Sequence, residues 1–149
     1  MVQKMIYLGS DHVGFKLKEN LRTWLTQWNQ VFTDDGDLSL QLEDDYPDFA
    51  FKVAKDIRDS KDMGILICRT GQGMAIAANR FAHIRAILGQ NQEEVKKGRE
   101  DEDANVLVLA ADFLNEEEAK RLVETFLKTP FSNEERHRRR IGKLSEIGG

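Results

Sequence analysis

The chain has 149 residues, a formal net charge of −4 and a hydrophobic content of 40%. This length predicts one domain, spanning 1–149, and the mild acidity indicates neither nucleic-acid nor membrane binding. No apolar run approaches the roughly 20 residues needed to cross a bilayer, and no N-terminal run resembles a signal peptide. The single cysteine cannot form an internal disulfide, so we expect a reducing, cytoplasmic location.

Short β-rich segments alternate with segments of helical period from the start of the chain. Residues 4–9 predict a buried strand. A helix follows, with one apolar face made of Leu17, Leu21, Trp24, Leu25 and Trp28. Residues 30–33 predict a short second strand, which leads into a polar loop. Pro47 suits the first turn of the next helix, whose apolar side chains are Ala50, Val53, Ala54 and Ile57.

The same alternation continues to residue 130. The segments are strand 63–68, a small-residue helix near 73–81, strand 84–89, a charged helix near 91–100 and strand 104–110. Asn115 and Glu118 then have the spacing of a capping box, and Pro130 ends the helix that they begin. Strands that are apolar on both faces and separated by helices predict an α/β fold, with a five-stranded parallel sheet covered on both sides.

The end of the chain has a different composition. Residues 131–149 predict a helical tail that is rich in arginine, including Arg136 and Arg140. A solvated basic helix is the ordinary explanation of such a segment. Its charges are too few and too local, in an acidic chain, to indicate nucleic-acid binding.

Ligands of open parallel sheets bind at the carboxyl ends of the strands. Asp11 and His12 follow the first predicted strand, and the glycine loop that begins at Cys68 follows the third. The acidic residues 101–103 instead precede the fifth strand, so they lie at the opposite edge. They could reach a site at the carboxyl edge only from a second subunit.

The glycine loop has the sequence CRTGQGM, from Cys68 to Met74. It lacks the GK[ST] of a phosphate-binding Walker loop and the third glycine of a dinucleotide fingerprint. A thiol at a helix N-terminus is expected to have a lowered pKa, although an isolated cysteine after an apolar strand is most often a small buried hydrophobe. Asp11 could equally be a helix cap and His12 a surface residue.

The histidines give no indication of a metal centre. The chain has three of them, and they lie far apart without the spacing of metal ligands. We therefore predict no metal site.

Five motifs in order resemble one known family. They are GSDHVGFKLKENL, DYPDFA, GILICRTGQGMAIAANR, DANVLVL and RHRRRI, and they extend over almost the whole chain. The chain is similar to ribose-5-phosphate isomerase B and the galactose-6-phosphate isomerase subunits. The resemblance implies a Rossmann-like three-layer α/β/α sandwich, in a homodimer or tetramer with active sites at subunit interfaces.

The resemblance also implies an activity, the isomerisation of an aldose phosphate to a ketose phosphate through an enediolate without cofactor or metal. Cys68 matches the base that moves a proton between C1 and C2 of the sugar. Thr70 and the backbone N–H groups of Gly71, Gly73 and Met74 would hold the developing oxyanion.

The remaining site residues implied by the resemblance bind the substrate. Asp11 and His12 match residues that bind the sugar ring, help to open it or hold its phosphate. Arg136 and Arg140 match two arginines that bind the phosphate, and at one helical turn apart they share a helix face.

Four positions depart from the family pattern. Asp101 and Glu102 stand where these isomerases usually carry a His-Asn pair that serves in ring opening. Asp112 replaces an arginine that reaches the phosphate, and Arg69 replaces a glycine. One like-charge contact at about 4 Å costs on the order of 4 kcal/mol at an effective dielectric constant near 20.

Two functional interpretations therefore remain open. In the first, the chain is an active isomerase with shifted sugar preference, in which Asp101 takes over proton transfer in ring opening. In the second, it is a non-catalytic or half-site subunit that assembles with a paralogue. The presence of Asp11, His12, Cys68 and Thr70 favours an active enzyme, and the sequence does not identify the sugar.

Overall fold

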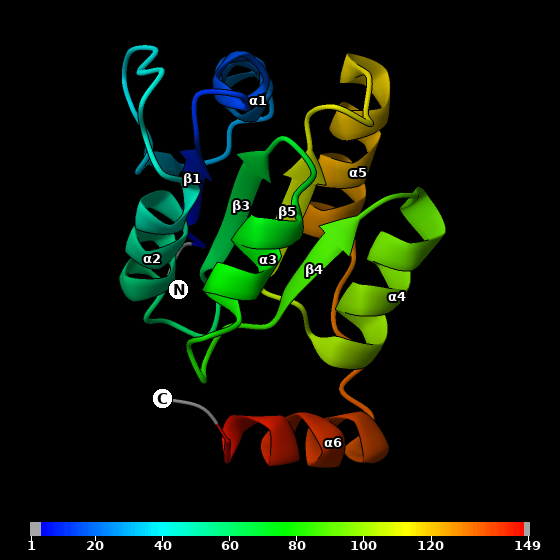
Figure 1. The fold of residues 1–149 in the computed structure, drawn as a ribbon. Helices are drawn as coiled ribbons and strands as arrows, with labels where there is room; N and C mark the ends of the chain where they lie inside the picture. The colour runs from blue at the N-terminus through cyan, green and yellow to red at the C-terminus, as the bar shows by residue number, and fades with distance from the viewer. Residues whose placement is uncertain (1–3, 148–149) are drawn as a thin grey trace.

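The five apolar runs form one parallel sheet in the computed structural model, which describes residues 4–147 (Figure 1). The strands are β1 (Ile6–Ser10), β2 (Phe32–Asp34), β3 (Met63–Cys68), β4 (Ala86–Gly89) and β5 (Val106–Ala110). Their order across the sheet is β2-β1-β3-β5-β4, and every neighbouring pair is parallel. The predicted α/β fold with a five-stranded parallel sheet is confirmed.

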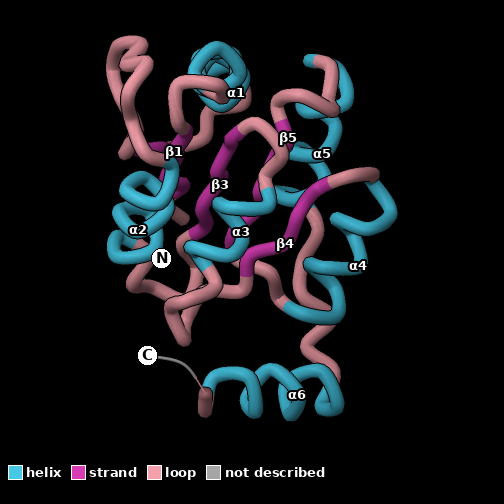
Figure 2. Tube along the Cα trace, in the orientation of Figure 1, coloured by secondary structure: helices cyan, strands magenta, loops and turns pink. Residues whose placement is uncertain are grey.

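Helices cover both faces of this sheet (Figure 2). In chain order, the helices of the described residues are α1 (Phe15–Gln27), α2 (Tyr46–Asp56), α3 (Gln72–Ala78), α4 (Gln92–Glu102), α5 (Glu116–Lys128) and α6 (Glu135–Ser145). Helices α2 and α3 lie against one face, whereas α1, α4 and α5 lie against the other (Figure 1). The three-layer α/β/α arrangement is therefore as predicted.

The central strand β3 supplies both hydrophobic cores. Ile65 and Ile67 pack in the core that faces α1 and α5, whereas Leu66 and Cys68 pack in the core that faces α2 and α3. Successive side chains of a strand point to opposite faces, so a strand covered on both sides must be apolar throughout. The alternation also decides that the Cys68 side chain points towards the α2 and α3 layer.

Element boundaries differ from the predicted ones where polar groups form local bonds. The predicted strand 30–33 begins too early, because the Gln30 N–H donates to the Leu25 carbonyl in the turn after α1. The helix predicted over 73–81 ends at Ala78, since the Asn79 side chain hydrogen-bonds both backbone groups of Ala86 at 2.8 and 3.0 Å. The capping box of Asn115 and Glu118 is confirmed.

The predicted helical tail corresponds to α6. This helix lies beyond the amino ends of the strands, outside both helical layers, and contacts the main body through α4 (Figure 1). Residues 131–134 are not helical, and the last two residues of the predicted tail, 148 and 149, lie outside the described residues. Between residues 4 and 147, no helix combines the length and apolar character required to cross a membrane.

Candidate active site

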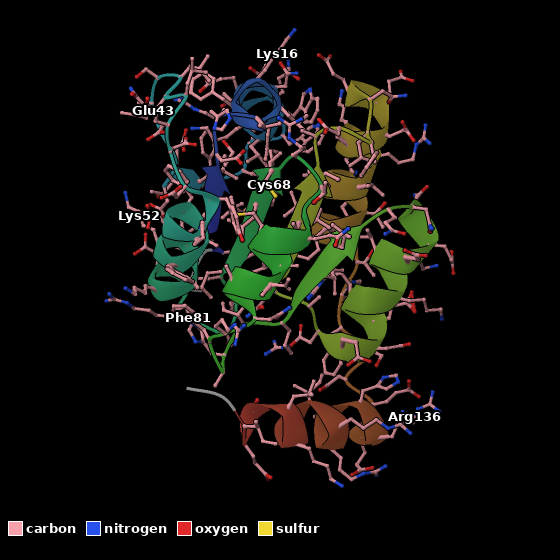
Figure 3. All side chains as sticks on the ribbon, viewed as in Figure 1. Lys16, Glu43, Lys52, Cys68, Phe81 and Arg136 are labelled. Atoms are coloured by element: carbon pink, nitrogen blue, oxygen red, sulfur yellow. The ribbon has the colours of Figure 1, made fainter. Side chains whose placement is uncertain are left out.

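Cys68 is the last residue of β3, at the carboxyl edge of the sheet (Figure 3). Its side chain is buried, with 5% of the residue exposed. Ser10 pairs with Ile67 in the parallel register, which brings Asp11 to the level of Cys68 on the adjacent strand. The structure therefore places the thiol where β3 enters the glycine loop, as predicted, with a carboxylate beside it.

Two opposing influences act on the pKa of Cys68. Burial is the largest, and it raises the pKa above its ordinary value; the negative charge of Asp11 adds to this. Backbone N–H groups of Met74, Gly71 and Thr70 bond to the thiol group and lower the pKa, but the net shift is upward. The predicted lowering is wrong for the single chain, because depth of burial outweighs the helix-end donors.

Gly71 and Gly73 allow the loop its shape for different reasons. Gly71 has a φ of 79°, in the left-handed region that favours glycine, and a β-carbon there would collide with the Leu88 side chain. Gly73 has an ordinary φ, but a β-carbon would come within 2.6 Å of the Tyr46 ring. A side chain is therefore excluded at Gly71 by the backbone angle and by Leu88, and at Gly73 by the Tyr46 ring.

Tyr46 is a site residue that sequence reasoning missed. It begins α2 and its ring lies directly over Gly73, so it covers one side of the glycine loop. With 40% of the residue exposed, it is also a large apolar side chain left open to solvent. The available signal was an aromatic residue immediately before Pro47, at the start of a helix that reaches the same edge.

Asp11 shapes the turn between β1 and α1. Its Oδ1 accepts hydrogen bonds from the N–H groups of Val13 at 3.1 Å and Gly14 at 3.2 Å. Gly14 is packed so closely that a β-carbon would lie 2.9 Å from the Ile67 carbonyl oxygen. The helix cap considered for Asp11 is not observed, because the N-cap residue of α1 is Gly14, without a side-chain cap; Asp11 is instead a buried carboxylate that closes the turn before the helix and lies near Cys68.

His12 is fixed by an acidic residue that the sequence did not single out. The Nδ1 atom of His12 lies 2.8 Å from Oδ1 of Asp44, and the same oxygen accepts the His12 backbone N–H at 3.1 Å. Asp44 lies in the polar loop before α2. No periodic pattern marks that loop, so only the fold could reveal the contact.

Thr70 lies at the mouth of the loop. Its Oγ1 accepts the N–H of Gln72 at 3.4 Å, which helps to start α3. Thr70 also lines a cavity of about 280 Å³ at the carboxyl edge, together with Gln72, Leu88, Gly89, Gln90, Ala110, Phe113, Leu114 and Glu118. A larger cavity of about 570 Å³ lies between α4 and α5, which cover the face of the sheet opposite to the Cys68 side chain, so it is not part of the site.

The other predicted site residues lie at the opposite edge of the sheet. Arg136 is on α6, at the far end of the molecule from Cys68 (Figure 3). Arg140 is exposed one helical turn further along α6. Asp101 is near the end of α4, and its Oδ1 lies 3.7 Å from Nε2 of the buried His137 on α6. Within one chain the structure does not bring these residues to Cys68.

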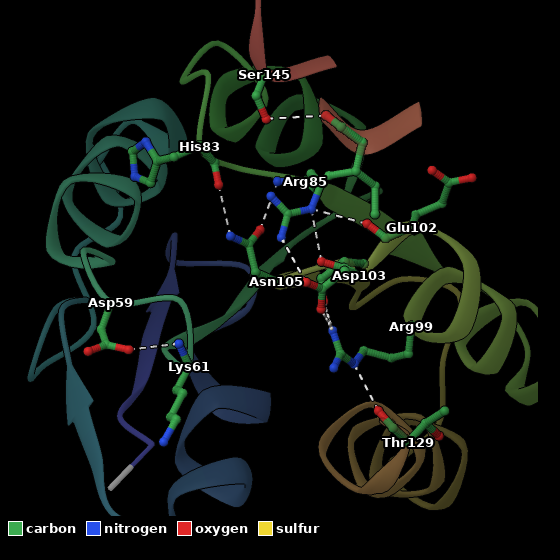
Figure 4. A network of polar contacts seen from close by, with 12 residues as sticks. Asp59, Lys61, His83, Arg85, Arg99, Glu102, Asp103, Asn105, Thr129 and Ser145 are labelled. Carbon is green, nitrogen blue, oxygen red and sulfur yellow. Dashed lines mark hydrogen bonds and ion pairs between the residues drawn. The ribbon is translucent and has the colours of Figure 1, made fainter. Parts of the chain in front are cut away.

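The amino edge is held by a network of its own (Figure 4). Arg85 donates to the carbonyl oxygens of Glu102 and Asp103, at 3.1 and 2.9 Å. Arg99 is almost fully buried and bonds Asp103 at 2.9 Å and the Thr129 carbonyl at 3.0 Å. Asp103 therefore stabilises the end of α4, whereas Asp101 and Glu102 precede it at the surface.

Titratable side chains offer no metal centre in the part of the chain that the structure describes. Residues 4–147 contain no group of three or more His, Cys, Asp or Glu side chains placed to hold an ion. Each histidine has a different protein partner: Asp44 for His12, the Ala54 carbonyl for His83, and Ser132 for His137.

Known proteins share this sequence pattern and this fold. The profile of the Ribose/Galactose Isomerase family matches residues 6–144. The chain belongs to this family. Among the family's curated members, a probable ribose-5-phosphate isomerase B of Mycoplasma genitalium is 41% identical over 145 residues, covering 93% of this chain and 92% of that protein.

Solved structures of Ribose/Galactose Isomerase family members agree with the fold. A ribose 5-phosphate isomerase from Thermotoga maritima is 42% identical, with a TM-score of 0.90 and coverage of 96% of this chain and 98% of that one. The Mycoplasma genitalium ribose-5-phosphate isomerase B, solved with bound ribulose-5-phosphate, is 36% identical with a TM-score of 0.93. That likeness covers 98% of this chain and 97% of the other.

Proposed function

We propose that this chain interconverts ribose 5-phosphate and ribulose 5-phosphate. Its full-length relatives named as ribose-5-phosphate isomerase B support this, including the one solved with ribulose-5-phosphate. The observation that carries the proposal is the buried thiol of Cys68, surrounded by backbone N–H donors and adjacent to Asp11 at the carboxyl edge. A purely structural cysteine would not need these donors.

Cys68 acts as the base in this scheme. Its thiolate removes the proton from C2 of the open-chain aldose, which leaves an enediolate, and the same proton returns to C1 to give the ketose. One proton changes carbon, and a proton moves between the two oxygens. The sugar as a whole is neither oxidised nor reduced, so the step requires no redox cofactor.

The glycine loop stabilises the charge that develops on oxygen. The N–H groups of Gly71 and Met74, which bond to the thiol group in the free chain, would also donate to an oxyanion that binds beside it. The N–H of Gly73 and the Thr70 hydroxyl would add to these donors. Donors fixed by backbone geometry need no reorganisation when the charge forms.

Asp11 and His12 complete the carboxyl edge. Asp11 would accept a ring hydroxyl proton as the sugar opens, and His12 would hold the ring or its phosphate. Both follow β1 directly, so they lie on the same edge as Cys68.

A second copy of the chain would supply the phosphate contacts. Arg136 and Arg140 lie at the amino edge, and neither can reach the Cys68 of its own chain. In a homodimer or tetramer with shared sites, the two arginines would face the neighbouring thiol. Their positive charge would also oppose the effects that raise the pKa of Cys68. Asp101 remains a predicted contributor to the same shared site, and a cytoplasmic location remains part of the proposal.

The purified chain alone should form ribulose 5-phosphate from ribose 5-phosphate, whereas Cys68→Ser should lose at least about 100-fold in turnover while keeping its melting temperature. Hexose phosphates and unphosphorylated pentoses, assayed side by side, define the substrate preference. A Cys68→Ser variant with full activity would contradict the assignment of the base. Activity that requires an added paralogous subunit would support the half-site alternative instead.

Mixing two inactive variants tests whether sites are shared. Cys68→Ser subunits lack the base, and subunits with Arg136→Ala and Arg140→Ala lack the phosphate contacts. Random pairing at equal amounts should restore about a quarter of wild-type activity, because half the dimers are mixed and each has one intact site. Mixed dimers without any activity would show that the arginines do not act in the partner's site.

A further inference from the structure

A buried acidic pair lies behind His12 and is not used by the chemistry described above. Oδ1 of Asp44 lies 2.8 Å from the imidazole Nδ1 of His12 and accepts the backbone N–H of His12 at 3.1 Å. The Asp44 side chain is 8% exposed, whereas 32% of the His12 side chain is exposed. The Nδ1 edge of the imidazole is therefore fixed by Asp44, and the other edge is open to a ligand.

Asp37 forms the second half of the pair. The Oδ2 atoms of Asp37 and Asp44 are both buried without a hydrogen-bond partner among residues 4–147, yet the two carboxyl groups lie within hydrogen-bonding reach of each other. Two buried carboxylate oxygens can satisfy one another only if one of them carries a proton. Burial, the hydrogen bond with Asp44 and the charge of Asp44 raise the pKa of Asp37, so Asp37 is the member that favours the shared proton.

Charged groups on the neighbouring elements anchor this pair. Lys18 of α1 is fully buried, and its Nζ donates to the Asp37 carbonyl at 2.5 Å and to both oxygens of Asp34 at 2.8 and 2.9 Å. Asp34, on β2, adds negative charge near Asp37. Burial alone would raise the pKa of Asp44, but hydrogen bonds and the charge of His12 outweigh it and lower the pKa. Asp44 is thus the charged member of the pair.

We propose that Asp44 is a positioning residue for His12, and that the carboxyl group of Asp37 controls how firmly Asp44 holds it. With Nδ1–H donated to Asp44, His12 presents Nε2 to the substrate in one fixed orientation. Deprotonation of Asp37 places two facing carboxylates in one buried space, and their repulsion loosens the loop that carries both. The contact of His12 with the substrate rests on the proposed function, whereas the contact of His12 with Asp44 does not.

The decisive variants are Asp44→Asn and a matched control, Asp45→Asn, one residue along and exposed. The chain has three histidines, so imidazole nitrogen signals in NMR spectra can be assigned to His12. In the wild type these signals should report a single tautomer protonated on Nδ1. Asp44→Asn should give a mixture of tautomers, and Asp45→Asn should not.

Kinetics provide the second readout. Asp44→Asn should lower kcat/KM for ribose 5-phosphate by about 10- to 100-fold, the range for loss of a hydrogen bond to a charged group. Asp45→Asn should change it less than about 3-fold. Unchanged His12 signals in Asp44→Asn would overturn the proposal, and so would altered signals with kcat/KM equal to that of the control. A wild type without isomerase activity would refute the proposed function, while the NMR result would still decide the contact.

Asp37→Asn tests whether Asp37 controls the contact between Asp44 and His12. It also keeps the proposal testable if Asp44→Asn does not fold. An amide in place of the carboxyl group donates to Asp44 at every pH, as the protonated acid does. As pH is raised above the ordinary range of an aspartate, the wild-type His12 signals should show loosening of the contact with Asp44, and Asp37→Asn should abolish this change. An unaltered pH response in Asp37→Asn would overturn the role of Asp37.

Discussion

The Arg69 guanidinium lies 3.5 Å from the Asp112 carboxylate, across the loops that follow β3 and β5. These are two of the positions at which the sequence departs from the family it resembles, and their unlike charges offset each other. Both side chains are largely exposed, so the pair is worth at most about 1 kcal/mol of stability. Arg69 therefore offsets part of the negative charge that Asp112 brings to this edge.

This pairing predicts opposite effects of two substitutions on phosphate binding. Asp112→Asn should lower KM for ribose 5-phosphate, because it removes a negative charge and frees Arg69. Arg69→Ala should raise KM. The free energy of unfolding should change by less than about 1 kcal/mol in each case, which denaturant titration would check. Equal KM values in both variants would place the pair outside the phosphate's reach.

The reactivity of Cys68 should report its raised pKa. The rate of alkylation by iodoacetamide should rise with pH through an inflection above the ordinary cysteine range, because burial disfavours the thiolate. Asp11→Asn removes a charge that raises the pKa, so the inflection should move to lower pH. Cys68 is the only cysteine, so the label reports it alone. An inflection that does not move would mean that Asp11 is screened from the thiol.

Alanine substitutions of the tail arginines should differ in their effects on KM. Arg136→Ala and Arg140→Ala should each raise KM for a phosphorylated sugar by an amount that corresponds to about 1.5–3 kcal/mol. Arg139→Ala is the matched control, because its guanidinium pairs with Glu135 at 2.9 Å on another face of α6. Arg138→Ala should likewise matter less. If all four variants have the same KM, the tail is simply a basic surface.

Alanine substitutions at Gly71 and Gly142 should change the stability of the fold in opposite directions. Gly71→Ala should destabilise the fold by about 1–3 kcal/mol, because alanine is strained at a φ of 79° and its β-carbon meets Leu88. Gly142→Ala lies in the interior of α6 with open space around it, and should stabilise the helix by about 0.5–1 kcal/mol. Thermal unfolding of both variants measures the difference. A neutral Gly71→Ala would show that the loop can relax.

Asp35 should make stability depend on pH. Burial, the hydrogen bond with Asp56 and the charge of Asp56 raise its pKa from 3.8 to about 7. The folded chain therefore keeps a proton that the unfolded chain has lost. This contribution to the free energy of unfolding is complete below about pH 4 and lost as pH rises to about 7, with a size on the order of a few kcal/mol.

Asp35→Asn isolates that contribution. The amide does not titrate, so the variant should lose less unfolding free energy than the wild type between about pH 4 and about pH 7. Urea titrations at several pH values provide the comparison. Parallel pH curves for the two proteins would show that Asp35 titrates as an ordinary aspartate.

Periodicity and end signals were enough to predict the strands, the helices and the edge that carries Cys68. The limits of β3 were predicted correctly, because its six buried residues form one apolar run between polar neighbours. The order of the strands was not predictable, since β5 enters between β3 and β4 and nothing local in β5 specifies its neighbours. Parallel neighbours are chosen by packing over the whole sheet.

The parts of the site that sequence reasoning missed depend on distance in space. The pKa of Cys68 follows from how deeply the α2 and α3 layer buries it, which no motif states. Tyr46 and Asp44 reach the carboxyl edge only because the loop after β2 folds back over it. The contact of Asp101 with His137 likewise needed the position of α6.

The separation of the thiol and the tail arginines onto opposite edges of one sheet has a genetic consequence. If each site takes its base from one chain and its phosphate ligands from another, a chain with a defect at one edge can still complete a site of its partner with the other edge. Two alleles of one gene, one with Cys68→Ser and one with Arg140→Ala, would rescue each other in a cell that expresses both. Two alleles damaged at the same edge would not. Complementation between alleles could then show to which edge a residue belongs.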